Sequence, residues 1–404
     1  MNYEQAKELL GQKGQTQLLR FYGELNGEER AELLRQIERI DWNALSPSSR
    51  VQEGEISPAS GLTLDGIAAR REEFFAAGKD AVKRGKVAAV LLAGGQGTRL
   101  GSDAPKGTFD IGITRPLYIF ELLIGNLRAV LKECGGSVPL LVMTSEKNDA
   151  ETRAFLKEHA YFGYPEEDVF FFVQDMAPAT DFDGKILLES KSRIALSPNG
   201  NGGWYSSLCR SGLLPALEKR GIEWLNVFAV DNVLQRIADP LFVGATVLSG
   251  LPCGAKVVRK SCPEERVGVL CLKGGLPHVV EYYELSEEMA NARDGKGELL
   301  YSFGVTLNYL FRLTRLEEIA AREIPVHVVK KKIPCIDEGG NPVLPETENG
   351  YKYETLILDM VRLTGSCLPF EIEREKEFAP VKNRTGTDSV ESARILLQKN
   401  GVKL

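Results

Sequence analysis

The sequence has few of the residues on which several common chemistries depend. Its 404 residues include only three histidines, His159, His278 and His327, which lie far apart in the chain. A histidine-based catalytic triad or a zinc site therefore has little support. The seven cysteines are scattered, and none is spaced as C-x-x-C. This pattern indicates reduced thiols that serve mostly as packing residues.

The chain also lacks an excess of positive charge and any long apolar run. Its 50 Lys and Arg against 56 Asp and Glu give a net charge of -6 and a pI near 5.5. Binding to nucleic acids or anionic membranes needs a basic face, so neither is an expected partner. A phosphate ligand would have to be bound by a few specifically positioned cations. No run approaches the ~20 apolar residues that cross a bilayer, and the opening MNYEQAKELLGQKGQ is too polar for a signal peptide. We therefore expect a cytoplasmic protein.

Helical patterns dominate the first part of the chain. In NGEERAELLRQIERI, the residues Leu33, Ile37 and Ile40 recur at helical spacing behind Asn26, which is a suitable N-cap. A second helical pattern, LTLDGIAARREEFFAAGKDAVKRG, is closed by Gly85. Between the two lies a connection rich in proline, serine and glycine, residues 46–61.

From Lys86 onward, short apolar runs alternate with helical patterns, which is typical of a parallel sheet covered on both faces. The runs VAAVLLA, VPLLVMTS, VFFFVQ and WLNVFAV are the expected strands, and PLYIFELLIGNLRAVLKECGG is the first crossover helix. More polar alternation in AKVVRK, VGVLCL and HVVEYYEL predicts an antiparallel or mixed extension of the sheet. The last part combines the turn-rich DEGGNPVLPETENG with a final helix, SVESARILLQK.

A glycine-rich stretch, LLAGGQGTRLGSDAPKGTFDIG, follows the first expected strand directly. It contains no G-x-x-x-x-G-K-[ST] and is therefore not a P-loop. Gly95, Gly97 and Gly101 nearly match the dinucleotide fingerprint G-x-G-x-x-G, but the last spacing is one residue too long. Glycines of this kind let a backbone approach a phosphate closely.

The same stretch carries two cations, Arg99 and Lys106. Dinucleotide sites rely mainly on helix N-terminal amides, whereas an arginine and a lysine about seven positions apart can clamp a polyphosphate. The loop therefore favours a nucleotide triphosphate. Two alternatives stay open at this point: a surface turn with solvated cations, and an NAD(P)-dependent oxidoreductase with Glu146 beyond the second strand as its acidic residue.

This loop, followed by PKG, resembles that of the UDP-N-acetylhexosamine pyrophosphorylases, within the wider family of UDP-sugar uridylyltransferases. Ala93 and Gln96 favour the acetylhexosamine branch over the UDP-glucose enzymes. Residues 86–390 carry the resemblance. Further motifs occur in the order of that family: DGKILLE, PNGNGG, VDN, CGAKVV, VGV, VVEY, KKIP and PVKN.

The resemblance implies an α/β fold, with a Rossmann-like, GT-A-like nucleotidyltransferase domain containing a mixed sheet. We expect a helical N-terminal domain over residues 1–84, a central catalytic domain over 85–325 that binds UTP and sugar, and a small α+β C-terminal domain over 326–404 that closes over the site. The sequence does not indicate an oligomeric state.

The implied reaction is attack by a sugar 1-phosphate on the α-phosphorus of UTP, which forms a UDP-sugar and releases pyrophosphate. Both reactants are anions, so cations and positioning lower the barrier more than acid–base groups do. N-acetylglucosamine 1-phosphate is the first expected substrate, followed by N-acetylgalactosamine 1-phosphate and glucose 1-phosphate. A UTP–glucose-1-phosphate or broad-specificity UDP-sugar pyrophosphorylase, and a non-catalytic UDP-sugar sensor, are the alternatives.

By the same resemblance, Arg99 binds the departing pyrophosphate, Lys106 the phosphates at the reacting centre, and Lys382 a phosphate from the C-terminal domain. Asp231 follows an apolar strand, where open α/β sheets place ligands, and its carboxylate can hold Mg²⁺ (or Mn²⁺). A helix N-cap or turn is the other interpretation of Asp231, and a solvated side chain that of Lys382. The run Lys330–Lys332 is expected to be a solvated or strand-edge cluster.

The remaining implied contacts divide between nucleotide and sugar. Gln174 and the backbone of Gly200 would recognise the uracil edge. The nucleotide contacts as a set are Leu92, Ala93, Gly94, Gly95, Gln174 and Gly200, and the sugar contacts are Asn201, Gly268, Glu281 and Asn308. The stretch SFGVTLN departs from the family pattern, because Phe303 and Val305 replace smaller or polar residues. Such a change is worth only ~1 to 3 kcal/mol, which is enough to reorder the preference among sugars.

Overall fold

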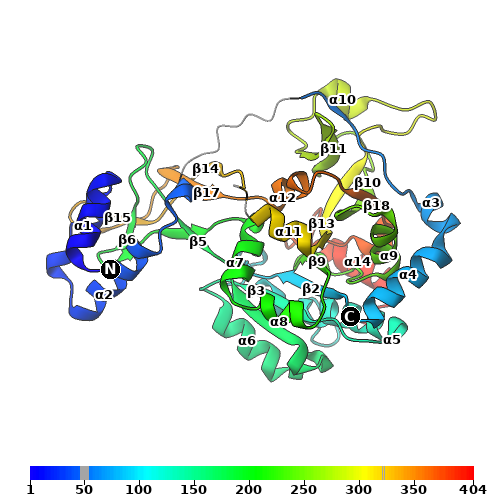
Figure 1. Cartoon of the computed structure of the whole chain (residues 1–404), viewed down its shortest axis with the longest axis horizontal. Helices are drawn as coiled ribbons and strands as arrows, with labels where there is room; N and C mark the ends of the chain where they lie inside the picture. Colours follow the sequence, from blue (N-terminus) through cyan, green and yellow to red (C-terminus); the bar gives the residue numbers. More distant parts are fainter. Residues whose placement is uncertain (46–53, 321, 323) are drawn as a thin grey trace. The chain divides into compact units, whose positions relative to one another are not determined.

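The computed structural model describes residues 1–45, 54–320, 322 and 324–404 (Figure 1). Contacts group the chain into two compact units, each discontinuous in sequence. Unit 1 comprises Met1–Val51, Asp175–Gly203 and Ile324–Asp359, and unit 2 comprises Gln52–Gln174, Trp204–Glu323 and Met360–Leu404. In the described part of the chain, no helix has both the length and the apolar character that a membrane crossing needs. The cytoplasmic location stays a prediction.

A ten-stranded mixed sheet forms the centre of unit 2. Its main path runs β1-β11-β13-β9-β2-β3-β4; β10 lies between β13 and β18, and β12 pairs with β11. Strands β9, β2, β3 and β4 run parallel to one another, whereas β13 is antiparallel to β9, β10 and β11. The strands are β1 Ile56–Pro58, β2 Val87–Leu92, β3 Leu140–Thr144, β4 Val169–Val173, β9 Trp224–Ala229, β10 Cys253–Arg259, β11 Val269–Lys273, β12 Leu276–Val280, β13 Phe303–Arg312 and β18 Leu368–Glu371.

The expected α/β architecture is therefore confirmed, including the parallel strands and their antiparallel extension. The structure adds β1 inside the connection predicted over residues 46–61; residues 46–53 of that connection lie outside the described residues. The helices of unit 2 are α3 Leu64–Ala69, α4 Arg71–Lys83, α5 Ile119–Cys134, α6 Asp149–Glu158, α7 Trp204–Arg210, α8 Leu214–Lys219, α9 Pro240–Ser249, α10 Glu287–Asn291, α11 Leu313–Ala320, α13 Arg374–Glu377 and α14 Val390–Lys399.

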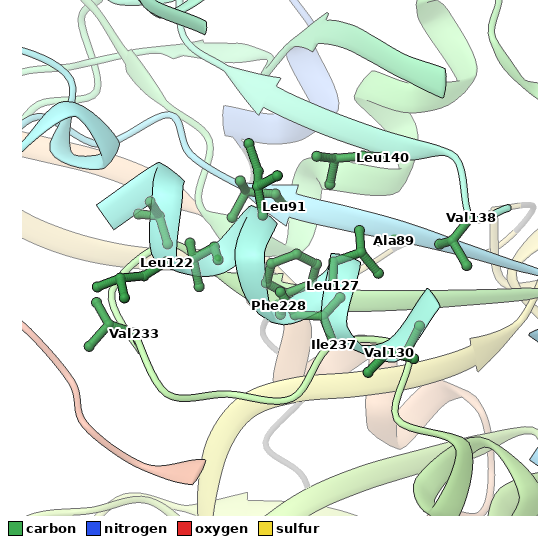
Figure 2. Packing of buried hydrophobic residues seen from close by; sticks show 14 of the residues in the cluster. Ala89, Leu91, Leu122, Leu127, Val130, Val138, Leu140, Phe228, Val233 and Ile237 are labelled. Atoms are coloured by element: carbon green, nitrogen blue, oxygen red, sulfur yellow. The ribbon is translucent and has the colours of Figure 1, made fainter. Parts of the chain in front are cut away.

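Helix α5 packs its apolar face on one side of the sheet (Figure 2). Leu122, Leu127 and Val130 of this helix meet Ala89 of β2 and Phe228 of β9 in one buried cluster. Both faces of β2, β3 and β9 are buried, which is why their sequences are almost wholly apolar. On the other side of the sheet, Trp204 of α7 packs on Phe311 of β13, with ring centroids 6.1 Å apart.

Helices α4 and α9 approach each other closely because each carries a glycine at the crossing. A Cβ on Gly78 would lie 1.8 Å from the Pro240 carbonyl oxygen, and one on Gly244 would lie 1.8 Å from the Phe74 carbonyl oxygen. Larger residues at either position would force the two helices apart.

Unit 1 is built from small sheets and the first two helices. Helices α1 (Tyr3–Gln12) and α2 (Gly27–Glu38) share a buried apolar cluster with the hairpin β6–β7. Asn26 caps α2 through a capping box with Glu29, as its sequence predicts. The strands are β5 Met176–Pro178, β6 Leu188–Ser190, β7 Arg193–Ile194, β8 Leu196–Pro198, β14 His327–Lys331, β15 Cys335–Ile336, β16 Pro342–Val343 and β17 Gly350–Glu354, and α12 (Ile357–Leu363) continues into unit 2.

The compact units do not follow the three consecutive ranges expected from the sequence. Strand β14 pairs with β17, so residues 327–354 belong to unit 1, whereas β18 pairs with β10 and joins residues 360–404 to the large sheet. Helices α3 and α4 likewise belong to unit 2 and not with α1 and α2. The division into three consecutive functional domains stays a prediction.

Candidate active site

The carboxyl ends of β2, β3, β4 and β9 meet at one edge of the large sheet. Their register aligns Leu92 with Met143 and with Ala229, and Thr144 with Val173. The residues just beyond these ends therefore lie together: the glycine loop after β2, Gln174 after β4 and Asp231 after β9. This is the edge at which open α/β sheets bind ligands.

The glycine loop folds back on itself directly after β2. Gly97 donates its N–H to the carbonyl oxygen of Ala104, and Lys106 donates its backbone N–H to that of Gly95 at 3.2 Å. The buried Asn148 side chain donates to the carbonyl oxygens of Ala93 and Gly95, at 3.0 and 3.3 Å. These hydrogen bonds hold Lys106 close to the end of β2, at the sheet edge. The sequence predictions did not include Asn148, although its place just after the second strand was a usable signal.

Gln174 lies directly against the start of the glycine loop. A Cβ on Gly94 would meet the Gln174 side-chain oxygen at 2.7 Å, so only glycine leaves room for this amide. The Gln174 side chain is buried, and its backbone N–H is held by the carbonyl oxygen of Thr144 at 2.8 Å. Leu92 and Ala93 are also buried, so they would reach a nucleotide mainly through their backbone.

Three cations and one carboxylate gather at this edge. Burial lowers the pKa of the Lys106 ammonium; the Asp231 carboxylate raises it, and Arg99 and Lys382 lower it further. Arg99, Asp231 and Lys382 therefore each lie close enough to Lys106 to act on its pKa, although up to 283 positions separate these residues in the chain (99 to 382). A cluster of cations around a half-buried lysine is suited to a polyanionic ligand.

Lys382 reaches the cluster through a backbone pairing. Val381 donates its N–H to the Asp231 carbonyl oxygen at 2.8 Å, and Asn232 and Pro380 form an isolated antiparallel β-bridge. The Lys382 ammonium forms an ion pair with Asp388 at 3.0 Å, and both side chains are partly exposed. Lys382 thus belongs to unit 2, together with Arg99, Lys106 and Asp231.

A further arginine, missed in the sequence, approaches the glycine loop. Gly101 has a φ of 74°, in the left-handed region that favours glycine, and a Cβ there would lie 3.2 Å from a guanidinium nitrogen of Arg384. Arg384 is exposed and follows PVKN by one residue. The segment that carries Lys382 therefore brings a second cation to the loop of Arg99.

Asp231 was predicted to hold Mg²⁺ (or Mn²⁺), and its surroundings fit that interpretation. Within residues 1–45, 54–320, 322 and 324–404, no group of three or more His, Cys, Asp or Glu could hold a metal ion by itself. In the same described residues, no hydrogen bond or ion pair occupies the Asp231 carboxylate. One hard oxygen donor suits Mg²⁺, which takes its other ligands from phosphates and water. The metal itself stays a prediction.

Glu281, Gly268 and Val305 lie together, and Glu281 is close enough to Lys382 for the two charges to interact. A Cβ on Gly268 would lie 3.4 Å from a Glu281 carboxylate oxygen, and Val305 donates its N–H to the Gly268 carbonyl oxygen at 2.9 Å. Burial and the neighbouring Glu284 raise the pKa of Glu281, while Lys382 lowers it. Because Lys382 acts on both Glu281 and Lys106, Glu281, one of the predicted sugar contacts, lies in the same neighbourhood as Lys106, a predicted phosphate contact.

Asn308 occupies a different environment from the other predicted sugar contacts. Its side chain is buried, accepts from Asn226 at 2.8 Å and donates to Gln235 at 3.2 Å. These bonds join β13, β9 and the segment after β9. The structure therefore gives Asn308 a structural role, and its contact with a sugar stays a prediction.

Gly200 and Asn201 belong to unit 1 and are built into its own framework. Gly200 has a φ of 86°, and a Cβ there would meet the Thr355 carbonyl oxygen at 2.2 Å. The Asn201 side-chain oxygen accepts from the Ile357 N–H at 2.9 Å, at the start of α12. Both residues are fixed by this local packing, and their contacts with uracil and sugar stay predictions.

Comparison with known proteins assigns this chain to a family. A family model described as UTP–glucose-1-phosphate uridylyltransferase matches residues 31–403. The chain belongs to this family. In this chain, the glycine loop and the cations around it lie at one edge of the sheet, and their roles in a reaction stay predictions.

Individual relatives narrow the position of the chain within the UTP–glucose-1-phosphate uridylyltransferase family. Human UDP-N-acetylhexosamine pyrophosphorylase-like protein 1 is 39% identical over 94% of this chain and 80% of its own length. The UDP-N-acetylglucosamine pyrophosphorylase of Saccharomyces cerevisiae is 35% identical over 98% of this chain and 90% of its own. A crystal structure of the uridine diphosphate N-acetylglucosamine pyrophosphorylase from Trypanosoma brucei in complex with an inhibitor is similar, with a TM-score of 0.78, 31% identity, and coverage of 93% of this chain and 80% of that chain.

These similarities confirm the resemblance and the nucleotidyltransferase fold predicted from the sequence. They also confirm the predicted enzyme class, a uridylyltransferase, and favour it over the oxidoreductase and the UDP-sugar sensor. The assignment of individual site residues, in contrast, rests on the geometry of this chain.

Proposed function

We propose that the protein transfers the uridylyl group of UTP to N-acetylglucosamine 1-phosphate, forming UDP-N-acetylglucosamine and pyrophosphate. The observation that carries this proposal is the cluster of Arg99, Lys382 and Asp231 around Lys106, at the sheet edge where Gln174 lies against the glycine loop. Two anions must meet there, and fixed cations lower the repulsion between them.

Each cation has its own part in this proposal. Lys106, half-buried and held by the backbone of Gly95, would contact the α-phosphate and the attacking phosphate. Arg99 is exposed and can follow the pyrophosphate as it leaves, with Arg384 nearby as a second partner. Lys382 would exchange its ion pair with Asp388 for a substrate phosphate.

Asp231 would hold Mg²⁺ (or Mn²⁺) together with substrate oxygens. When bound, the metal ion would supply charge neutralisation on the phosphates. The chain's own residues orient the reactants: Gln174 offers an amide to the uracil edge, and Glu281 offers a carboxylate to sugar hydroxyls. An unpaired polar partner costs ~1 to 3 kcal/mol, so Gln174 can discriminate between bases.

N-acetylglucosamine 1-phosphate is proposed as the sugar substrate because the relatives reported above carry N-acetylglucosamine or N-acetylhexosamine in their names. Glucose 1-phosphate is the second candidate, because Val305 presents an apolar side chain beside Gly268, where a polar residue would serve an acetamido group better. Separation of the products formed from UTP and each sugar phosphate tests the choice. UDP-N-acetylglucosamine as the main product supports the proposal, and UDP-glucose as the main product contradicts it.

A further inference from the structure

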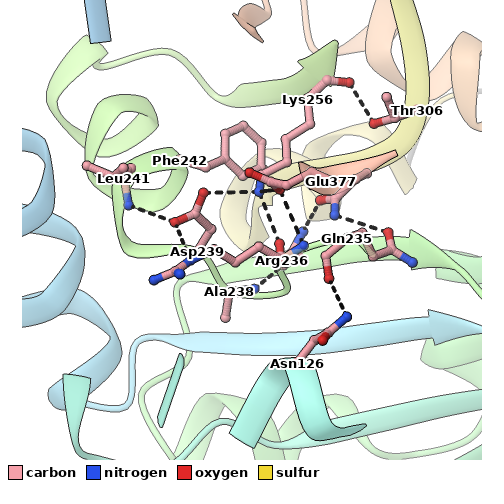
Figure 3. Close-up of polar contacts among 12 residues, drawn as sticks. Asn126, Gln235, Arg236, Ala238, Asp239, Leu241, Phe242, Lys256, Thr306 and Glu377 are labelled. Carbon is pink, nitrogen blue, oxygen red and sulfur yellow. Dashed lines mark hydrogen bonds and ion pairs between the residues drawn. The ribbon is translucent and has the colours of Figure 1, made fainter. Parts of the chain in front are cut away.

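Lys256 is one of the most buried charged residues of unit 2. It lies on β10, and its side chain is 1% exposed. Its ammonium donates to the Arg236 carbonyl oxygen at 3.1 Å, to an Asp239 carboxylate oxygen at 3.0 Å and to Glu377 (Figure 3). All three donors of the ammonium are therefore used within the protein.

The cluster keeps the ammonium of Lys256 charged in a buried place, while burial raises the pKa of the Glu377 carboxyl. Burial by itself lowers the pKa of Lys256, but Asp239 and Glu377 outweigh it and raise that pKa above its ordinary value. Loss of either partner of a buried ion pair of this kind is strongly destabilising, because it leaves an unpaired buried charge. Glu377 also accepts from the Arg236 backbone N–H at 3.3 Å, so its carboxylate is held from two sides.

Glu377 begins the segment that ends at Lys382. Asn232 donates its side-chain N–H to the Glu377 carbonyl oxygen at 2.8 Å and accepts from the Ala379 N–H at 2.9 Å. Val381 then bonds to Asp231. The segment is thus fastened at one end by the buried charges and along its length by the residues that follow β9.

We propose that Lys256 and Glu377 are positioning residues for uridylyl transfer, which fix the segment 377–382 so that Lys382 stands beside Asp231 and Lys106. This inference rests on the proposed function, in which Lys382 contacts a substrate phosphate. The ammonium of Lys256 has no donor left for a reactant, since protein oxygens occupy all three. In this proposal, Lys256 and Glu377 act on the reaction through the position of Lys382.

A double-mutant cycle on the whole protein separates positioning from plain stabilisation. The variants are Glu377→Gln, Lys382→Ala and the two combined, each assayed for kcat and KM and melted thermally. We expect Glu377→Gln to lower kcat about 10-fold and Lys382→Ala about 100-fold, the scale of one lost electrostatic stabiliser. The combined variant should match Lys382→Ala within about 2-fold, because a misplaced segment no longer matters once its lysine is absent.

The control is Asp168→Asn, which breaks the ion pair with Arg220 just before β4, at the opposite end of the parallel strands. It should lower the melting temperature and leave kcat unchanged. If Glu377→Gln does not fold, Asn232→Ala replaces it in the same cycle, since it frees the same segment without leaving a buried charge.

If the decrease in kcat of the combined variant equals the product of the two single decreases, the positioning role is overturned. An unchanged kcat in Glu377→Gln would overturn it as well. An unchanged kcat in Lys382→Ala would overturn it too. Turnover of UTP by the wild-type protein tests the proposed function separately, so the two failures are distinguishable.

Discussion

Val381 donates its backbone N–H to the carbonyl oxygen of Asp231 at 2.8 Å. This bond joins the end of β9 to a segment that lies 150 positions later in the chain (231 to 381). It brings the next residue, Lys382, close enough to Lys106 to act on its pKa, as the Asp231 carboxylate also does. All the residues of the proposed phosphate site therefore belong to unit 2, and the arrangement leads to predictions for single residues.

Lys106→Ala should lower kcat at least ~100-fold, because in the proposed reaction the half-buried ammonium would face the phosphates at the reacting centre. The matched control is Lys147→Ala, an exposed lysine beyond β3 with no proposed role. Steady-state kinetics with UTP and N-acetylglucosamine 1-phosphate check both variants. A rate near that of the wild type for Lys106→Ala would remove this lysine from the mechanism.

Gly94→Ala should weaken the recognition of uracil while the fold persists. The new methyl group would lie 2.7 Å from the Gln174 side chain, whose amide must move away, but no backbone strain arises because the φ of Gly94 is not positive. We expect KM for UTP to rise about 10-fold and the preference for UTP over CTP to fall. Gly125→Ala, on α5 with open space around it, is the control for stability. An unchanged preference for UTP would contradict the role of Gln174.

Val305→Asn should shift the choice of sugar toward N-acetylglucosamine 1-phosphate. Val305 is joined to Gly268, which lies against Glu281, so a polar side chain at this position can meet the acetamido group. The ratio of kcat/KM for N-acetylglucosamine 1-phosphate to that for glucose 1-phosphate should rise roughly 10-fold, the scale of one pocket contact. A ratio that does not change would place the determinant of specificity elsewhere.

Glu281→Gln should stabilise the free protein at neutral pH while it lowers activity. Burial and Glu284 raise the pKa of Glu281 above its ordinary 4.5, so the folded state binds this proton more tightly than the unfolded state does. The wild type therefore loses stability as the pH rises through the folded pKa, and the variant does not.

The difference in melting temperature between the two proteins should be largest at neutral pH and shrink as the pH falls toward 4.5. Glu288→Gln, which removes an exposed carboxylate on α10, should show no such trend. A difference that is the same at every pH would contradict the explanation by burial.

Much of the fold could be predicted because its signals are local. The apolar runs became β2, β3, β4 and β9, and the helical pattern after Pro116 became α5. The order of the strands could not be predicted, since β13 is wedged between β9 and β10 by pairings across more than fifty positions, such as Tyr309 with Ala255. For the same reason, the joining of residues 360–404 to the large sheet could not be predicted.

The candidate site shows the same limit. Arg99, Lys106 and Asp231 could be predicted because they follow recognisable strands, and Lys382 because of the PVKN motif. Lys256 could not be predicted, because in sequence it is one polar residue in a strand, while its partners Asp239 and Glu377 lie 17 and 121 positions away. Arg384 was missed for a similar reason: only the folded chain brings it to Gly101.

The most direct test of the whole account is pyrophosphate release from UTP by the wild-type protein, with Mg²⁺ and a panel of sugar 1-phosphates. The account predicts release that depends on the sugar phosphate, is fastest with N-acetylglucosamine 1-phosphate, and falls at least ~100-fold in Asp231→Ala. Binding of UTP or a UDP-sugar without release of pyrophosphate, whichever sugar phosphate is present, would contradict the account and favour a sensor.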